Sequence, residues 1–370
     1  MAETPVKLQV GLYSPGDEAD ILALNLLEYG STNVMVTPED FQWRYAENPA
    51  GQTQITVVRD AQTGHVVGFT WTIPLRMRLF RQDQLAALTA NLLIHPDYRK
   101  TMAYVKLITH RMRMLRQQKV PFRYNFPVES LFARTAKIEG MSSFLIPLMI
   151  RPLDMTQLAR ARFEQRWAAF LIGLGGALIK PFVFYDRDQH AKTDGVTLVW
   201  VDGFDRRFDD LWKRVKDKYE IMTVRDSAYL RWRFSPVSKR VYRTLAAMVD
   251  DVLVGYVVVR CTDEIRGIPI GLIMDFLLEP GPRGERAGAM LLREVWRYFN
   301  SEKVALAGGL ALPHTVECKL MQRAGYRSCP PRLAPRLFRV AFNCYAGTLP
   351  ATDHVQLSNW FLTIADYEAH

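Results

Sequence analysis

The chain has 370 residues, of which 49% are hydrophobic and 23% charged, so it can build two ordinary cores and is not a disordered or fibrous protein. Its formal net charge of +10 suits a polyanionic ligand, a nucleic acid or an anionic membrane, but the basic residues form no tract that would choose among them. The sequence shows no signal peptide and its four cysteines have no CxxC spacing. We therefore expect reduced thiols and a cytoplasmic protein without a metal site.

The first half of the chain predicts helices and strands in the order β-α-α-β-β-β-α-β-α-β. The expected strands are residues 8–13, 54–59, 66–78, 85–94, 122–126 and 144–150, and the expected helices follow Asp17, start at Pro38, and cover 102–118 and 130–138. This order predicts an α/β fold in which helices cover the faces of a mixed sheet.

The second half repeats the first. Residues 275–284 match residues 91–100 at a constant offset of 184, and three shorter echoes follow the same order. These echoes pair 41–45 with 230–234, 66–69 with 253–256, and 139–141 with 324–326. Such a series predicts two copies of one unit. We expect a first domain at 1–152, an apolar insert at 153–195 and a second domain at 196–370.

The elements expected in the second half follow the same plan. Strands are predicted at 197–201, 243–249, 253–260, 270–278, 304–306 and 337–342, and helices at 208–218, from about Arg286, and at 314–323. His314 and Cys318 would share a face of the last helix, but no second pair of metal-ligand type accompanies them.

A strand, turn and helix at 275–296 predict a site for a pyrophosphate. The apolar strand ends at Glu279, Pro280 and Gly281 force a turn, and the N–H groups of the next helical turn lack intrahelical partners. The helix dipole adds positive potential there, and Arg283 and Arg286 stand at the mouth of the turn.

This element order, with its phosphate-type turn and a Gly-aromatic end to the last helix, resembles the GNAT superfamily of acyl-CoA-dependent N-acyltransferases. The resemblance covers both halves, so the chain looks like two tandem GNAT-like acyl-CoA N-acyltransferase domains. It implies acetyl-CoA or another acyl-CoA as cofactor. The residues implied to bind it are Leu277, Leu278, Arg283, Gly284, Arg286, Ala287 and Gly288.

The resemblance also implies which half holds the cofactor. The second half keeps Arg283, Gly284 and Gly288 of the family turn, with Arg286 in the place of its middle glycine. In the first half, Met102 and a tyrosine two residues later replace both glycines. We expect the second half to bind the cofactor and the first half to be degenerate.

The chemistry implied by the resemblance is attack of an amine on a thioester. The N–H groups near Leu277 and Leu278 would polarise the thioester carbonyl, and Glu279 or Asp275 would act as the base. Each carboxylate has an alternative reading, since Glu279 could cap the turn and Asp275 could pair with an arginine. Met321 occupies the place where the family often has a tyrosine acid.

Two other features leave alternatives open. Trp43 and Trp232, in the repeated Trp-Arg-aromatic motif, are predicted to pack within each domain, while the arginines beside them pair with charges or carbonyls, or bind acceptor carboxylates. The apolar stretch 167–185 is interrupted by glycines and a proline, so it predicts internal packing, or else a helix at the surface of the inner membrane.

The sequence thus predicts an N-acyltransferase acting on a small-molecule or sugar amine. The tail residues Trp360, Thr363 and Asp366 resemble the ending of tandem GNAT-like proteins encoded with polysaccharide enzymes, which implies an amino sugar or polysaccharide precursor. One alternative is a non-catalytic scaffold of a membrane or polysaccharide-making complex. A Fem-type transferase using aminoacyl-tRNA is the other, and only it would need a nucleic acid.

Overall fold

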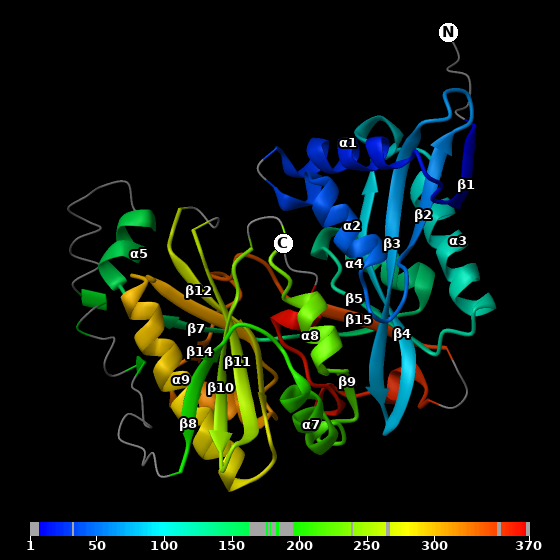
Figure 1. Cartoon of the computed structure of the whole chain (residues 1–370). Helices are drawn as coiled ribbons and strands as arrows, with labels where there is room; N and C mark the ends of the chain where they lie inside the picture. Colours follow the sequence, from blue (N-terminus) through cyan, green and yellow to red (C-terminus); the bar gives the residue numbers. More distant parts are fainter. Residues whose placement is uncertain are drawn as a thin grey trace.

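The computed structural model describes residues 7–31, 33–162, 175–176, 178, 183–184, 195–237, 240–263, 267–345 and 349–367. Two mixed sheets lie side by side, each flanked by helices (Figure 1). The predicted α/β fold class with mixed sheets is confirmed.

The first sheet has the order β1-β2-β3-β4-β5-β15-β6, and β9 adds to the far end of β3. Its strands are β1 (Leu8–Leu12), β2 (Gln54–Asp60), β3 (Val66–Leu79), β4 (Gln82–Ile94), β5 (Phe122–Asn125), β6 (Ser142–Leu145), β9 (Ile221–Thr223) and β15 (Arg339–Cys344). A two-residue turn joins the long strands β3 and β4. Phe80 and Arg81 both have positive φ there, as the tight turn of a twisted hairpin requires.

The second sheet has the order β14-β7-β13-β12-β11-β10-β8. Its strands are β7 (Leu148–Pro152), β8 (Thr197–Val201), β10 (Arg243–Val249), β11 (Val252–Thr262), β12 (Ile270–Leu278), β13 (Leu306–Leu310) and β14 (Arg327–Ser328). In both sheets a single parallel pair, β4 with β5 and β12 with β13, interrupts a run of antiparallel strands. The repeat seen in the sequence is therefore a repeat of sheet topology.

Helices pack against the faces of both sheets (Figure 1). They are α1 (Glu18–Tyr29), α2 (Pro38–Ala46), α3 (Ala103–Gln117), α4 (Glu129–Glu139), α5 (Met155–Arg162), α7 (Arg206–Val215), α8 (Ser227–Arg233), α9 (Pro282–Ser301) and α10 (Val316–Arg323). Short 3-10 turns are η1 (Val34–Val36), η2 (Pro96–Tyr98), η4 (Thr352–His354), η5 (Leu357–Asn359) and η6 (Ile364–Asp366). Side chains of Thr37, Asp205, Asp226 and Thr315 cap α2, α7, α8 and α10.

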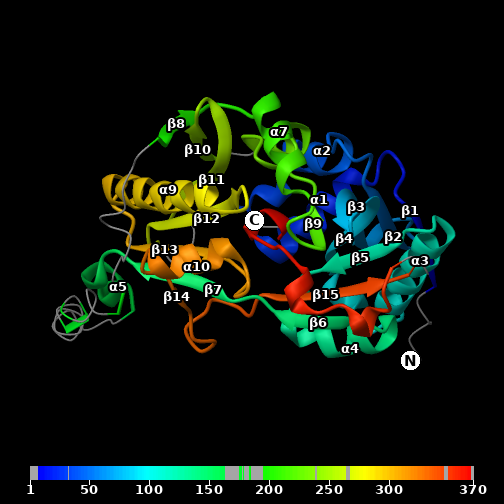
Figure 2. The ribbon, with the colours of Figure 1, turned by 90° about the horizontal axis from the view of Figure 1, so that it is seen from below.

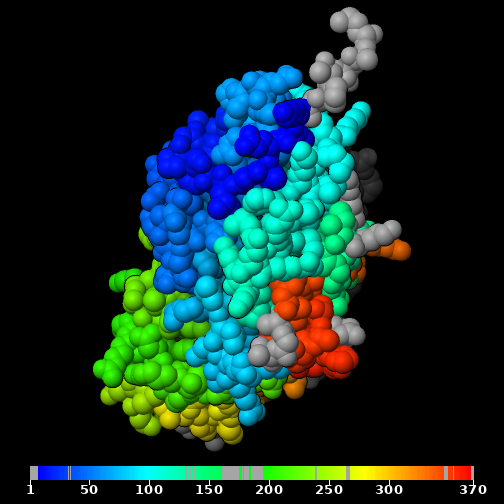
Figure 3. Space-filling model, turned by 90° about the vertical axis from the view of Figure 1, so that its right-hand side faces the viewer, coloured from blue at the N-terminus to red at the C-terminus, as the bar shows by residue number. Residues whose placement is uncertain are grey.

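The two sheets exchange one inner strand each. β15, from the end of the chain, lies between β5 and β6 of the first sheet, and β7, from the first half, lies between β13 and β14 of the second (Figure 2). The predicted closing strand at 144–150 is thus two strands, β6 and β7, that belong to different sheets. The space-filling view shows the C-terminal segment seated directly against the first half (Figure 3).

The largest hydrophobic core runs through both halves. It joins side chains of α1 and α2 to side chains of α7, α8 and the C-terminal tail. Trp232 packs against this core, and its ring stacks on that of Trp43, with centroids 5.3 Å apart and planes inclined by 24°. Each indole N–H donates to the other residue's carbonyl, at 2.8 and 3.2 Å. The repeated tryptophans therefore pack against each other across the two halves, rather than each within its own domain.

Most of the apolar stretch 167–185 lies outside the described residues, and so does its predicted packing. Within the residues that the structure describes, no helix is both long and apolar enough to cross a membrane.

Candidate functional site: the two strand splays

In each sheet the parallel pair separates toward the carboxyl ends of its strands. β4 and β5 pair only through Ala87 and Leu88, whereas β4 continues to Ile94. β12 and β13 pair from Ile270 to Ile273, whereas β12 continues to Leu278. We call these regions the first-half splay and the second-half splay.

The predicted phosphate turn sits at the end of the second-half splay. Gly281 has φ of 97°, which favours glycine, and Pro282 begins α9. A side chain at Gly284 would clash with the carbonyl oxygen of Glu279, so the tight turn depends on this glycine. The first bond of the helix runs from the Glu285 N–H to the Gly281 carbonyl at 3.0 Å. The N–H groups of the two residues before Glu285 therefore remain for an anion, while Pro282 has none to give.

The side chains predicted beside this turn point in different directions. Arg283 donates to the carbonyl of Val249 at 2.9 Å, which holds its guanidinium against the β10–β11 turn. Arg286, the fifth residue of α9, is exposed, and its contact with a phosphate stays a prediction. Ala287 is fully buried in the core of the second sheet.

Gly288 serves helix packing. A Cβ there would lie 2.6 Å from a methyl carbon of Leu278 and 2.7 Å from one of Leu320. Gly288, one of the residues implied to bind the cofactor, thus faces β12 and α10.

Of the two predicted carbonyl-polarising residues, Leu278 faces the splay. The Glu279 N–H donates to Val254 on β11 at 2.8 Å, and N–H directions alternate along an antiparallel strand. The N–H of Leu278 thus points away from β11, and that of Leu277 points toward it. A thioester carbonyl in the splay could reach the N–H of Leu278.

A buried carboxylate that the sequence analysis missed already occupies that N–H. Glu317 on α10, 2% exposed, accepts from the Leu278 N–H at 3.3 Å. Lys218 and Tyr219 hold the same carboxylate at 2.7 and 2.9 Å. Burial and the charge of Glu317 raise the pKa of Tyr219, so this hydroxyl stays protonated. The sequence could have pointed to Glu317, because it lies one helical turn before Met321, on the same helix face as the position where the family often has a tyrosine acid.

Asp275 is completely buried and forms only internal bonds. It accepts from Arg225 at 3.1 Å and from the hydroxyls of Tyr256 and Thr363, both at 2.8 Å. Burial, then the charge of Asp275, raises the pKa of Tyr256 well above its ordinary value. Asp366 of the tail completes the network by binding Arg225 at 2.5 Å. Asp275 thus has the structural role given as the alternative, and in this conformation no substrate can reach it.

Glu279 remains accessible at the end of β12. Its side chain is 20% exposed and pairs with the half-exposed Arg214 at 3.1 Å. Between the two predicted bases, Glu279 alone has a surface that a substrate amine can approach.

The two splays differ in how they are covered. Met274 to Leu277 on β12 are all buried, and η6 of the tail packs against this strand. The corresponding residues 90–93 of β4 are partly exposed. In the first half, Tyr104 is buried and its hydroxyl bonds Thr135 on α4, while Met102 is exposed. That these two side chains keep a pyrophosphate out of the first half stays a prediction.

Solved structures of other proteins share this fold. The chain is similar to a probable N-acyltransferase from Enterococcus faecalis, with a TM-score of 0.61, 12% identity, and coverage of 91% of this chain and 73% of that one. A GCN5-related N-acetyltransferase from Anabaena variabilis matches with a TM-score of 0.61, 14% identity and the same coverage. N-myristoyltransferase from Saccharomyces cerevisiae with bound myristoyl-CoA matches at 0.56 and 12% identity, covering 92% and 84%. No family model and no curated protein matches the sequence.

Proposed function

We propose that this protein is an acyl-CoA-dependent N-acyltransferase that acts on an amine. The observation that carries the proposal is the splayed parallel pair in each sheet, ending in the second half beside a helix N-terminus. The Leu278 N–H is directed into that splay, and the exposed Arg286 is the fifth residue of α9. The similar N-acyltransferase structures support the same reaction class.

In the proposed reaction the amine nitrogen attacks the thioester carbonyl carbon. An amide bond forms, the carbon–sulfur bond breaks, the amine loses a proton to a base, and the thiolate leaves as CoA. The N–H of Leu278 would stabilise the developing oxyanion, and Glu279 would take the proton. Glu317 has to release the Leu278 N–H first, because a carbonyl and a carboxylate cannot use this donor together.

The half that binds the cofactor is a separate proposal. The sequence assigns it to the second half, and the short turn with Gly284 and Arg286 supports that assignment. The first half is the alternative, and the partly exposed end of β4 favours it.

A matched pair of variants distinguishes the halves. Arg286→Ala and Lys100→Ala each remove one exposed positive charge beside the phosphate turn of one half. A charge-assisted contact contributes about 1.5–3 kcal/mol, so losing it weakens CoA binding at least about 10-fold in calorimetry. We expect this loss for Arg286→Ala alone. Loss for Lys100→Ala alone would place the cofactor in the first half.

Failure of the wild-type protein to bind CoA, acetyl-CoA or myristoyl-CoA would refute the proposed function. The scaffold and the aminoacyl-tRNA alternatives would then be tested next, the second by binding to charged tRNA.

The sequence also predicts a sugar amine as acceptor and a cytoplasmic location. The tail motif that implied a sugar amine is internal here, since Trp360 is fully buried and Asp366 binds Arg225. Its residues are thus explained by packing. A cytoplasmic location, with contact to the inner membrane through 167–185, stays a proposal that cell fractionation can test.

A further inference from the structure

The carboxylate of Glu317 occupies a position where two hydrogen-bond donors meet. One of its oxygens, Oε1, accepts from Nζ of Lys218 at 2.7 Å and from the N–H of Leu278 at 3.3 Å. Tyr219 donates to the other oxygen, Oε2, at 2.9 Å. The side chains of Lys218 and Glu317 are only 8% and 3% exposed. Oε1 therefore marks a point inside the protein that favours a negatively charged oxygen.

A backbone contact also holds Lys218 at this point. Its Nζ donates to the carbonyl of Leu278 at 3.1 Å, so the ammonium group lies beside the end of β12. Lys218 follows α7, whereas Glu317 comes from α10, so the two side chains reach the second-half splay from separate segments. The contact with Leu278 would keep the ammonium group beside the Leu278 N–H when the carboxylate of Glu317 leaves.

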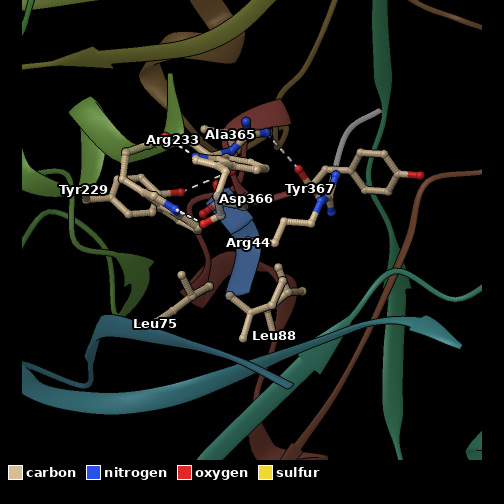
Figure 4. A pocket seen from close by; sticks show the side chains of 11 residues that line it. Arg44, Leu75, Leu88, Tyr229, Arg233, Ala365, Asp366 and Tyr367 are labelled. Carbon is tan, nitrogen blue, oxygen red and sulfur yellow. Dashed lines mark hydrogen bonds between the residues drawn. The ribbon is translucent and has the colours of Figure 1, made fainter. Parts of the chain in front are cut away.

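The C-terminal tail covers this point. Residues 361–363 line a small cavity in the splay together with side chains of β12 and α10, and Glu317 is one of them. The tail is held in turn by α8, where Arg233 donates to the carbonyl of Ala365 at 2.8 Å (Figure 4). In such a covered place a charged donor interacts more strongly with an anion than it does in water.

We propose that Lys218 is a catalytic residue that stabilises the oxyanion together with the Leu278 N–H, and that Glu317 blocks this position until the thioester displaces it. The acetyl thioester group and the end of a glutamate side chain have the same number of heavy atoms, so the exchange needs little additional space at this point. This inference concerns the regulation and chemistry of the proposed site, and so rests on the proposed function.

The charge of Lys218 makes this stabilisation selective for the transition state. The neutral thioester carbonyl replaces the carboxylate of Glu317 without its charge. When the amine attacks, a carbon–nitrogen bond forms and the carbonyl oxygen becomes negative, which restores an ion pair with Lys218. The carbon–sulfur bond then breaks, the thiolate leaves as CoA, and the amine proton goes to Glu279. Lys218 keeps its proton throughout.

The first experiment compares the wild-type protein with the double variant Lys218→Met/Glu317→Gln. The double variant loses both charges of the buried pair together, which costs less stability than losing one of them, so it should fold. The measurement is the infrared stretching frequency of bound acetyl-CoA with an isotope label at the thioester carbonyl. We expect a lower frequency in the wild-type protein, because Lys218 polarises this carbonyl and methionine does not. Equal frequencies would overturn the inference.

A kinetic comparison tests the same residue during turnover. Hydroxylamine serves as a small amine acceptor, and Glu317→Gln alone is measured beside the double variant. We expect kcat to be about 100-fold lower in the double variant than in Glu317→Gln, with KM for acetyl-CoA within about 3-fold, as for the loss of one oxyanion donor. Similar kcat values, with changes only in KM and thermal stability, would reduce Lys218 to a structural role. Loss of transfer already in folded Glu317→Gln would show that Glu317 itself is needed, and would overturn its blocking role.

A control variant and a binding measurement complete the test. Lys213→Met removes an exposed charge of α7 that pairs with Asp210 at 2.8 Å, and should leave both the frequency and kcat unchanged. The same losses in this control would contradict the assignment to Lys218. Failure of the wild-type protein to bind acetyl-CoA would refute the proposed function and this inference with it. Binding of acetyl-CoA with equal frequencies and equal kcat values would refute the inference alone.

Discussion

The stacked pair Trp43 and Trp232 should couple the two halves energetically. Replacing either ring by Phe removes one indole N–H bond to a carbonyl, at a cost of about 0.5–1.5 kcal/mol. The stacked contact adds about 0.5–1.5 kcal/mol beyond buried area, and both single variants impair it. We expect each single variant to lose about 1–3 kcal/mol, and the double variant to lose less than the sum of the two.

The assay is a double-mutant cycle from guanidinium unfolding followed by circular dichroism. The coupling energy should be about 0.5–1.5 kcal/mol, because the partners touch directly. Trp296→Phe is a control, since this ring is 36% exposed on α9 and belongs to one half. Additive losses, within the error of the cycle, would show that the stack does not join the halves. Two separate unfolding transitions in the wild-type protein would refute the continuous core.

Three further expectations follow from buried groups. Glu139→Gln should lower the unfolding free energy by about 3–5 kcal/mol, because it leaves two buried arginines without their carboxylate, whereas Glu129→Gln at an exposed pair should leave the unfolding midpoint nearly unchanged. Burial raises the pKa of Cys318 to about 11, so iodoacetamide at pH 8 should modify it only after unfolding, and rapid labelling of folded protein would contradict this. Burial lowers the pKa of His314, so the folded state binds a proton less readily than the unfolded state, and stability should fall as the pH drops below about 6.5. His314→Gln should flatten this dependence in urea midpoints measured between pH 8 and pH 5.5, and an unchanged slope would assign the effect to other groups.

The element order could be predicted from sequence because it rests on local signals. Alternating apolar residues mark β2 to β4, and the echoes between 91–100 and 275–284 mark the repeat. The strand exchange could not be predicted this way. β7 and β15 are both short apolar strands, and periodicity shows that a strand is half-buried without showing which sheet receives it.

The candidate site was predictable in part for a similar reason. The turn at Gly284 is local, so its glycine could be recognised from the strand and helix beside it. The partners of Asp275 come from three distant segments, which no spacing brings together in advance. Glu317 was missed because its role depends on the Leu278 N–H, a backbone group whose direction only the sheet register fixes.

The exchange of β7 and β15 also sets the order in which the chain can mature. As the protein leaves the ribosome, β5 and β6 emerge long before β15, the strand that lies between them. The first sheet therefore lacks this strand until Cys344 has been synthesised. During that interval two strand edges stay open to any other nascent or misfolded chain. Shortening the chain before β15 should therefore release an aggregation-prone protein rather than a smaller domain. Production at low temperature or with chaperones should improve the yield of the full chain more than that of the truncated one.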